Sequence, residues 1–154
     1  NNIAEIMIKD KNTIGGEESG GVGFGYYLPE RDGLASNLML LEFLAREKKS
    51  LNKMTIKLDK VYGPYRCSRV DVKFREAERK SIMSRVDEIV SSGKAAGKKI
   101  MRANRTDGTK IIFSEREWLL LRFSGTEPLL RIYAEAGTEA RVKELLAFGK
   151  KLVE

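Results

Sequence analysis

The feature that most constrains the fold of this chain is a pair of apolar, strand-like runs separated by a short polar turn. Residues 118–123 read WLLLRF and residues 129–134 read LLRIYA, and the turn between them belongs to the sequence RFSGTEP at 122–128. Pro128 fixes its own φ angle and therefore ends the turn. Two such runs this close together predict neighbouring antiparallel strands.

The turn itself carries the groups of an anion site. Arg122 can grip an oxyanion bidentately, Ser124 and Thr126 offer hydroxyls, and successive backbone amides can form an anion-binding concavity. Gly125 would let the backbone approach a ligand closely and adopt a positive φ. From the residues alone two interpretations stay open, namely a phosphate clamp and an ordinary hairpin turn with an exposed arginine.

Length and composition indicate a water-soluble chain. Its 154 residues, 42% of them hydrophobic, suffice for one full domain and part of a second. No apolar run approaches the roughly 18–20 residues of a membrane span, and the first ten residues do not resemble a signal peptide. Because the chain begins with Asn1, we expect a cut site inside a longer protein.

The residues that are rare or absent also limit the chemistry. The single Cys67 cannot form an internal disulfide, so we expect a reduced, cytoplasmic setting. The chain has no histidine, which removes the usual general base near neutral pH and the commonest zinc ligand. No arrangement of acidic residues resembles a metal cage.

The chain has a net charge of +7, and its charged residues are distributed unevenly along the sequence. Residues 46–105 carry 18 basic and 7 acidic side chains, whereas residues 1–45 carry 3 and 7. The basic segment could attract an anionic substrate or nucleic acid, or form a solvated face. Acidic residues interleave with the basic ones in 76–91, and no aromatic stacking pattern appears, so a nucleic-acid-binding module is the remote alternative.

The periodicity predicts an α+β architecture. From residue 69 onward the order is β-α-β-β-β-β-α, which predicts an antiparallel sheet of four to five strands with two helices on one face. The expected strands are 69–74, 98–104, 109–114, 117–123 and 129–135, and the helices are 76–91 and one capped by Thr138. The first 50 residues predict helices at 3–9 and after Asp32, with extended segments at 11–14 and 22–27.

A second loop, Gly16-Glu17-Glu18-Ser19-Gly20, has groups suited to a sugar. Glu17 can accept hydrogen bonds from two vicinal hydroxyls, and Ser19 can both donate and accept. Residues two apart in an extended stretch point the same way, so these two side chains converge. By itself the loop fits a sugar site or an acidic surface turn.

The two loops together resemble the α-D-phosphohexomutase family, which contains the phosphoglucomutases and phosphomannomutases. The resemblance rests on GEESGG at 16–21, Asp32-Gly33 at a helix start, RFSGTEP at 122–128 and Arg131-Ile132-Tyr133 after it. It covers essentially the whole chain. It implies that residues 1–50 end the family's third domain, 51–66 form a linker, and 67–154 form the fourth domain, similar to the TATA-binding-protein fold.

The resemblance also implies roles for the loop residues. Glu17 and Ser19 would hold the 3- and 4-hydroxyls of a hexose. Arg122, Ser124, Gly125 and Thr126 would bind the phosphate that is not reacting, with Arg131 as a second guanidinium. This chain would contain no catalytic or metal-binding residue, since the family's phosphoserine and Mg²⁺ site belong to N-terminal domains that are missing here.

The implied reaction interconverts hexose 1-phosphate and hexose 6-phosphate through a hexose 1,6-bisphosphate. The chain alone would be inactive and would need the missing domains as partner, with no nucleic acid or membrane involved. The sequence GEES leans towards glucose phosphate. However, contacts to O3 and O4 cannot separate glucose from mannose, so phosphomannomutase or another hexose specificity stays open. Gly21 stands where some family members have histidine.

Overall fold

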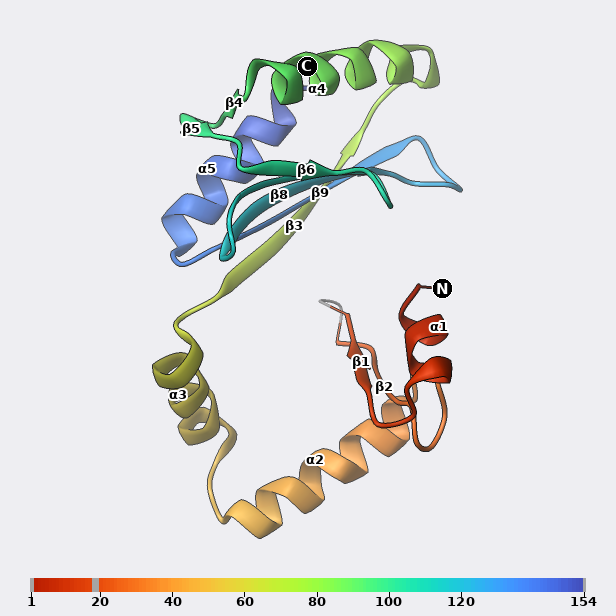
Figure 1. The fold of residues 1–154 in the computed structure, drawn as a ribbon, viewed down its shortest axis with the longest axis vertical. Helices are drawn as coiled ribbons and strands as arrows, with labels where there is room; N and C mark the ends of the chain where they lie inside the picture. Colours follow the sequence, from red (N-terminus) through yellow and green to blue (C-terminus); the bar gives the residue numbers. More distant parts are fainter. Residues whose placement is uncertain (1, 18–19, 154) are drawn as a thin grey trace. The chain divides into compact units, whose positions relative to one another are not determined.

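The computed structural model describes residues 2–17 and 20–153. The chain divides into two compact units, residues 1–58 and 59–154, and each is described by itself (Figure 1). Ser19 of the predicted sugar loop and its neighbour Glu18 lie outside the described residues.

The first unit is built on a short antiparallel hairpin. Helix α1 (Asn2–Lys9) precedes strands β1 (Ile14–Gly16) and β2 (Val22–Phe24), and helix α2 (Gly33–Glu47) follows. Met7 is 2% exposed, and a Cβ on Gly15 would come within 2.5 Å of its sulfur, so glycine leaves the space that Met7 fills. Asp32 caps α2 as predicted, because its Oδ1 accepts from Ala35 N at 2.9 Å.

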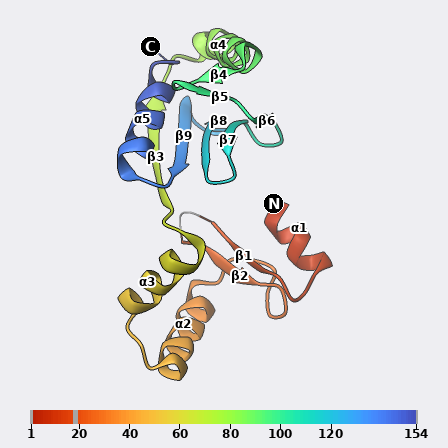
Figure 2. The same cartoon turned by 60° about the vertical axis from the view of Figure 1, so that its left-hand side comes forward.

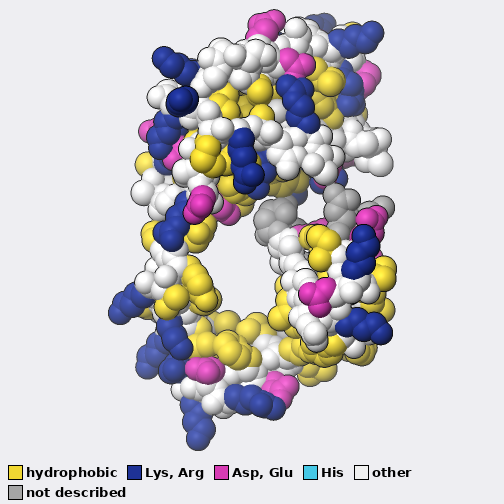
Figure 3. Space-filling model, viewed as in Figure 1, with side chains coloured by type: hydrophobic (Ala, Val, Ile, Leu, Met, Phe, Trp, Pro, Cys, Tyr) yellow, Lys and Arg dark blue, Asp and Glu magenta, His cyan; other side chains and the backbone are white. Residues whose placement is uncertain are grey.

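Helix α2 has the apolar stripe that the spacing predicts, but the stripe faces solvent. No residue of α2 is buried. Leu34, Leu38 and Leu41 are 74%, 59% and 62% exposed, and hydrophobic side chains are visible along the helix in Figure 3. The spacing thus predicts the apolar stripe correctly, but within the described residues the stripe is exposed.

Residues 51–62 form a helix where the pattern predicts a connection. Helix α3 (Leu51–Tyr62) has a single buried side chain, Met54. Its sequence contains neither glycine nor proline, and it ends just before Gly63, which adopts φ +85° and precedes Pro64. The missed signal is the helical spacing of Leu51, Met54, Leu58 and Val61.

The second unit is a five-stranded antiparallel sheet in the order β3-β9-β8-β7-β6, which confirms the predicted architecture. Its strands are β3 (Arg66–Lys73), β6 (Arg102–Asn104), β7 (Thr109–Ser114), β8 (Glu117–Phe123) and β9 (Leu129–Ala136). A short 3₁₀ turn, η1 (Glu76–Glu78), leads into helix α4 (Arg79–Ser92), and helix α5 (Glu139–Lys150) ends the fold.

The predicted strand at 98–104 is interrupted. Strand β5 (Lys98–Lys99) pairs with β4 (Lys94–Ala95) in a separate small hairpin, and β6 joins the main sheet. The break falls where Ile100 N donates to Gly93 O at 2.8 Å and Met101 N donates to Ile112 O at 2.8 Å. These two partners lie on different elements, so the chain turns from one to the other.

One core holds the sheet and its helices together. Alternate residues of β8 and β9 are fully buried, including Leu119, Leu130 and Ile132. Helix α5 packs along β3 and β9 (Figure 2), and α4 adds Ile82 and Val86 to the same core cluster. A Cβ on Gly149 would lie 2.7 Å from Ile132 Cγ2, so glycine permits this close helix–strand contact.

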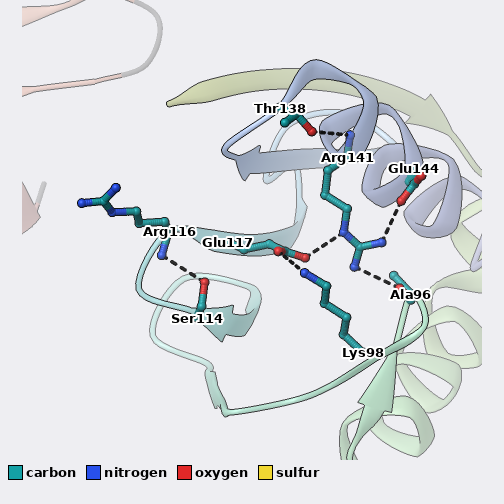
Figure 4. A network of polar contacts seen from close by, with 8 residues as sticks. All are labelled: Ala96, Lys98, Ser114, Arg116, Glu117, Thr138, Arg141 and Glu144. Atoms are coloured by element: carbon teal, nitrogen blue, oxygen red, sulfur yellow. Dashed lines mark hydrogen bonds and ion pairs between the residues drawn. The ribbon is translucent and has the colours of Figure 1, made fainter. Parts of the chain in front are cut away.

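A polar network closes one end of this core (Figure 4). Glu117, 9% exposed at the start of β8, accepts from Lys98 Nζ at 2.6 Å and from Arg141 Nε at 2.8 Å. Arg141 also donates to Ala96 O at 3.0 Å and to Glu144 Oε2 at 2.8 Å. The network therefore joins β8, α5 and the β4–β5 hairpin.

Candidate functional site

The loop at residues 124–128 connects β8 to β9 and is held at both ends. Ser124 N donates to Leu129 O at 2.8 Å, and Leu129 N donates to Glu127 O at 2.7 Å. Pro128 O accepts from Phe74 N at 3.2 Å, which ties the loop to the segment after β3. The loop is thus a short, braced turn whose position follows from the sheet.

The hydroxyl groups of the loop converge. Ser124 is 5% exposed, and its Oγ lies 3.5 Å from Thr126 Oγ1 and 3.4 Å from Thr126 N. Gly125 does not adopt the positive φ that the sequence allows, and a Cβ there would meet no atom within 4 Å. The backbone hydrogen bonds of the loop close the turn without a left-handed residue at this position. What Gly125 contributes is open space over the loop.

Two arginines stand side by side next to this loop. Arg122 on β8 and Arg131 on β9 are register partners, so their side chains lie on the same face of the sheet. Like charges directly opposite each other destabilise a sheet. Moreover, the Nε of Arg131 is buried and has no hydrogen-bond partner within residues 2–17 and 20–153. An anion bound between the two guanidiniums would relieve both costs.

Arg122 also has a partner that the sequence does not predict. Its Nε lies 3.1 Å from Asp107 Oδ1, at the tip of the hairpin between β6 and β7. Asp107-Gly108 predicts a hairpin, but not the strand that its tip will contact. That neighbour depends on the pairing of β7 with β8, which is a tertiary property.

The predicted sugar loop closes on itself in the first unit. Glu17 N donates to Gly21 O at 2.9 Å, and Gly20 N donates to Glu17 O at 3.0 Å, with Gly20 at φ +90°. Whether Ser19 converges with Glu17 stays a prediction, because Ser19 is outside the described residues. A small hollow of about 50 Å³ lies beside the loop and includes Glu17, Gly21 and Met7 in its lining.

Arg31 is the second partner that sequence reasoning missed. Its Nη1 lies 2.7 Å from Glu17 Oε2. The hydrogen bond to Glu17 is the main cause that raises the pKa of Arg31 above its usual value, followed by the one to Glu30. A Cβ on Gly21 would come within 2.6 Å of Arg31 Cδ, so glycine at this position leaves room for the arginine over the loop.

The described residues contain neither a cluster of metal ligands nor a membrane-spanning helix. Within residues 2–17 and 20–153, no three or more histidine, cysteine, aspartate or glutamate side chains gather where they could hold a metal ion. In the same part, no helix has the length and apolar character to cross a membrane.

The second unit is an α+β domain in which two register-paired arginines, Arg122 and Arg131, flank the loop at 124–128. Comparison with known families gives two matches: residues 1–62 match "Phosphoglucomutase/phosphomannomutase, alpha/beta/alpha domain III", and residues 71–148 match "Phosphoglucomutase/phosphomannomutase, C-terminal domain". The chain belongs to the phosphoglucomutase/phosphomannomutase family.

Individual relatives agree with this assignment. The chain is 38% identical over 152 residues to a phosphoglucomutase/phosphomannomutase of Thermococcus kodakarensis, covering 99% of this chain and 31% of the relative. It is 33% identical to a phosphoglucosamine mutase of Methanocaldococcus jannaschii, covering 99% of this chain and 32% of the relative. A solved structure of a putative phosphomannomutase from Thermus thermophilus matches with a TM-score of 0.72 at 33% identity, covering 98% and 29%. The chain thus spans about a third of the length of these curated relatives.

Proposed function

We propose that this chain supplies the phosphate-binding and sugar-binding loops of an enzyme that interconverts hexose 1-phosphate and hexose 6-phosphate. The observation that carries the proposal is the pair Arg122 and Arg131, register partners on the two strands that flank the loop where the Ser124 and Thr126 hydroxyls converge. Two guanidiniums and two hydroxyls match the oxygens and the double negative charge of a phosphate monoester.

In the proposed reaction this chain positions the substrate and takes no part in bond making. The loop at 124–128 holds the phosphate that is not being transferred. Glu17 and Ser19 hold the 3- and 4-hydroxyls. Transfer itself uses a phosphoserine, with Mg²⁺, in other domains of the full-length enzyme. Fixing both ends of the hexose would contribute to catalysis by orienting the reacting phosphate.

The proposal explains why the sugar contact must work in two orientations. A hexose 1,6-bisphosphate intermediate has to turn around before its second phosphate returns to the serine. The 3- and 4-hydroxyls form a vicinal pair that one carboxylate can accept from either way up. The same phosphate clamp then serves the C1 phosphate in one half-reaction and the C6 phosphate in the other.

We propose a glucose phosphate as substrate, with mannose or glucosamine phosphates as alternatives. The relatives named above carry both phosphoglucomutase/phosphomannomutase and phosphoglucosamine mutase names. Glucose, mannose and glucosamine differ at C2, which the proposed contacts do not reach. A cytoplasmic location belongs to the proposal too, and rests on the single cysteine.

The test is steady-state kinetics of the full-length enzyme with Arg122→Ala. Losing a desolvated, charge-assisted contact should lower kcat/KM by about 30- to 1000-fold, equivalent to about 2–4 kcal/mol. Arg102→Ala is the matched control, because Arg102 is an exposed arginine on β6 of the same sheet. A loss below about tenfold for Arg122→Ala would count against the clamp.

A binding measurement on the 154-residue chain complements the kinetics. In an NMR titration with glucose 1-phosphate and with inorganic phosphate, the amides of Ser124, Gly125 and Thr126 should shift, and Arg122→Ala should abolish these shifts. Shifts that appear only with a DNA duplex, spread over residues 46–105, would instead favour the nucleic-acid alternative.

A further inference from the structure

The hairpin tip formed by residues 105–108 is built against Arg122. Gly108 adopts φ +84°, and a Cβ there would lie 2.5 Å from Leu121 O and 3.0 Å from Arg122 Cα. Only glycine combines this φ with so close an approach. The backbone of the tip therefore touches β8 at the position that presents Arg122.

The tip is also braced from behind. Asn104 Oδ1 accepts from Thr106 N at 2.8 Å and from Thr106 Oγ1 at 2.7 Å, which orders the turn internally. Arg105 Nη1 lies 2.6 Å from Asp87 Oδ1 and so fastens the turn to α4. With its backbone held on both sides, the tip presents the Asp107 carboxylate at a set place.

That place is the Nε edge of Arg122. A guanidinium has five N–H donors in a rigid fork, and Asp107 Oδ1 lies 3.1 Å from Nε. The contact at Nε restricts rotation of the Arg122 guanidinium plane. The edge formed by the terminal Nη1 and Nη2 atoms stays available for a second oxyanion. Within the described part of the chain, Asp107 is the only ion-pair partner of Arg122.

The exposure of this pair shows that it contributes little to fold stability. The two side chains are 43% and 59% exposed, and ion pairs in that setting contribute little to folding. A tip ordered by Asn104, Thr106, Arg105 and Asp87 around so weak a pair makes sense if the result is the orientation of Arg122. The cross-strand neighbour of Arg122 is Arg131, which repels it, so some other group has to hold Arg122 in place.

We propose that Asp107 is a positioning residue, which holds the Arg122 guanidinium with its Nη edge turned to the phosphate. This inference rests on the proposed function, because it assigns to Asp107 a role in the same phosphate site. Asp107 does not touch the phosphate in this proposal and acts only through Arg122.

The test is a double-mutant cycle in the full-length enzyme, with glucose 1-phosphate as ligand and calorimetric Kd and kcat/KM as readouts. Asp107→Asn should weaken binding about fivefold when Arg122 is present, the size of a coupling between contacting side chains. In the Arg122→Ala background the same change should have less than about a twofold effect. Asp59→Asn, which cuts an exposed aspartate–arginine pair away from the hairpin tip, is the control and should change binding by less than about twofold.

The outcomes separate this inference from the proposed function. If Arg122→Ala has no effect, the phosphate site itself is wrong. If Arg122→Ala weakens binding but Asp107→Asn has equal effects in both backgrounds, or none, only the positioning role is wrong. Tighter binding in Asp107→Asn would also overturn it, since Asp107 would then compete with the phosphate for Arg122. Asp107→Glu, which restores the carboxylate, should recover part of the fivefold loss, and no recovery would contradict the proposal.

Discussion

At the scale of single residues, the candidate site contains two neighbouring arginines whose placement lowers the stability of the fold. Arg131 faces Arg122 across the β8–β9 pair and has a buried Nε with no hydrogen-bond partner in the described chain. Like-charge pairs and unsatisfied buried donors each destabilise a fold. Such an arrangement is expected where a ligand, and not the fold, supplies the compensating charge.

Arg131→Met should therefore separate stability from function. We expect the free energy of unfolding to change by less than about 1 kcal/mol, because the substitution removes an unpaired buried donor and a like-charge contact but also the opposite charge across from Asp71 on β3. We expect kcat/KM for hexose phosphate to fall at least about tenfold. Urea unfolding of the chain and kinetics of the full-length enzyme measure the two effects. A fall in stability of more than about 1 kcal/mol would show that Arg131 serves mainly the fold.

Glu17→Gln should affect the sugar and spare the phosphate. The substitution weakens the acceptor for two hydroxyls and removes the ion pair with Arg31. Hexose phosphate turnover should fall by about tenfold or more, while inorganic phosphate binds with unchanged affinity. Gly15→Ala, which would collide with Met7 in the same unit, reports the effect of disturbing the hairpin alone. Equal losses for both ligands in Glu17→Gln would mean that the loop is structural.

At the scale of elements, the Glu117 network fixes α5 to the sheet and makes stability depend on pH. Burial alone raises the pKa of the Glu117 carboxyl, but hydrogen bonds from Lys98 and Arg141 lower it more, so the pKa lies below its usual value. Burial lowers the pKa of Arg141, while its bonds to Glu144 and Glu117 raise it to a net value above the usual one. Both directions stabilise the ionised pair.

The chain should accordingly lose stability in acid. A carboxyl whose pKa is lower in the folded state binds fewer protons than in the unfolded state, so the unfolding free energy falls as the pH drops below about 4.3, the ordinary glutamate pKa. Glu117→Gln should cost about 2 kcal/mol at neutral pH and flatten this dependence. Urea unfolding at pH values from about 3 to about 7, on both sides of the ordinary glutamate pKa, measures both effects. An unchanged acid slope in Glu117→Gln would assign the dependence to other carboxylates.

At the scale of the whole molecule, the exposed stripe on α2 can be related to the length of the chain, which is shorter than that of its relatives. Leu34, Leu38 and Leu41 are exposed, and the chain spans about a third of the length of its relatives. We infer that other domains of the full-length enzyme cover this stripe. Burial of several leucines would supply a few kcal/mol to that contact.

Leu38→Gln tests this inference by comparing two forms of the protein. In the 154-residue chain, an exposed leucine contributes little, so the change in unfolding free energy should stay within about 0.5 kcal/mol. In the full-length enzyme the same substitution should cost about 2 kcal/mol or more, because a polar group then enters an apolar contact. Thermal unfolding of both forms gives the comparison. An equal, small effect in both would show that the stripe stays exposed.

The sequence by itself determined most of the elements of the second unit and the position of the polar turn between two of its strands. Two apolar runs predicted β8 and β9, helix caps at Asp32 and Thr138 are as expected, and the turn at 124–128 lies where the polar residues placed it. These features depend on near neighbours in the chain, so periodicity and side-chain chemistry suffice to find them. The family resemblance, which the comparisons confirm, rests on the same local motifs.

Only the tertiary structure decided which charged groups meet. Asp107 reaches Arg122, and Arg31 reaches Glu17, through contacts between segments separated along the chain. The interruption between β5 and β6 arises in the same way, because Met101 pairs with β7 and Ile100 does not. Strand register and loop packing are set by many distant residues together, and no local pattern encodes them. The physical reason is that a side chain's partner depends on where the rest of the fold places it.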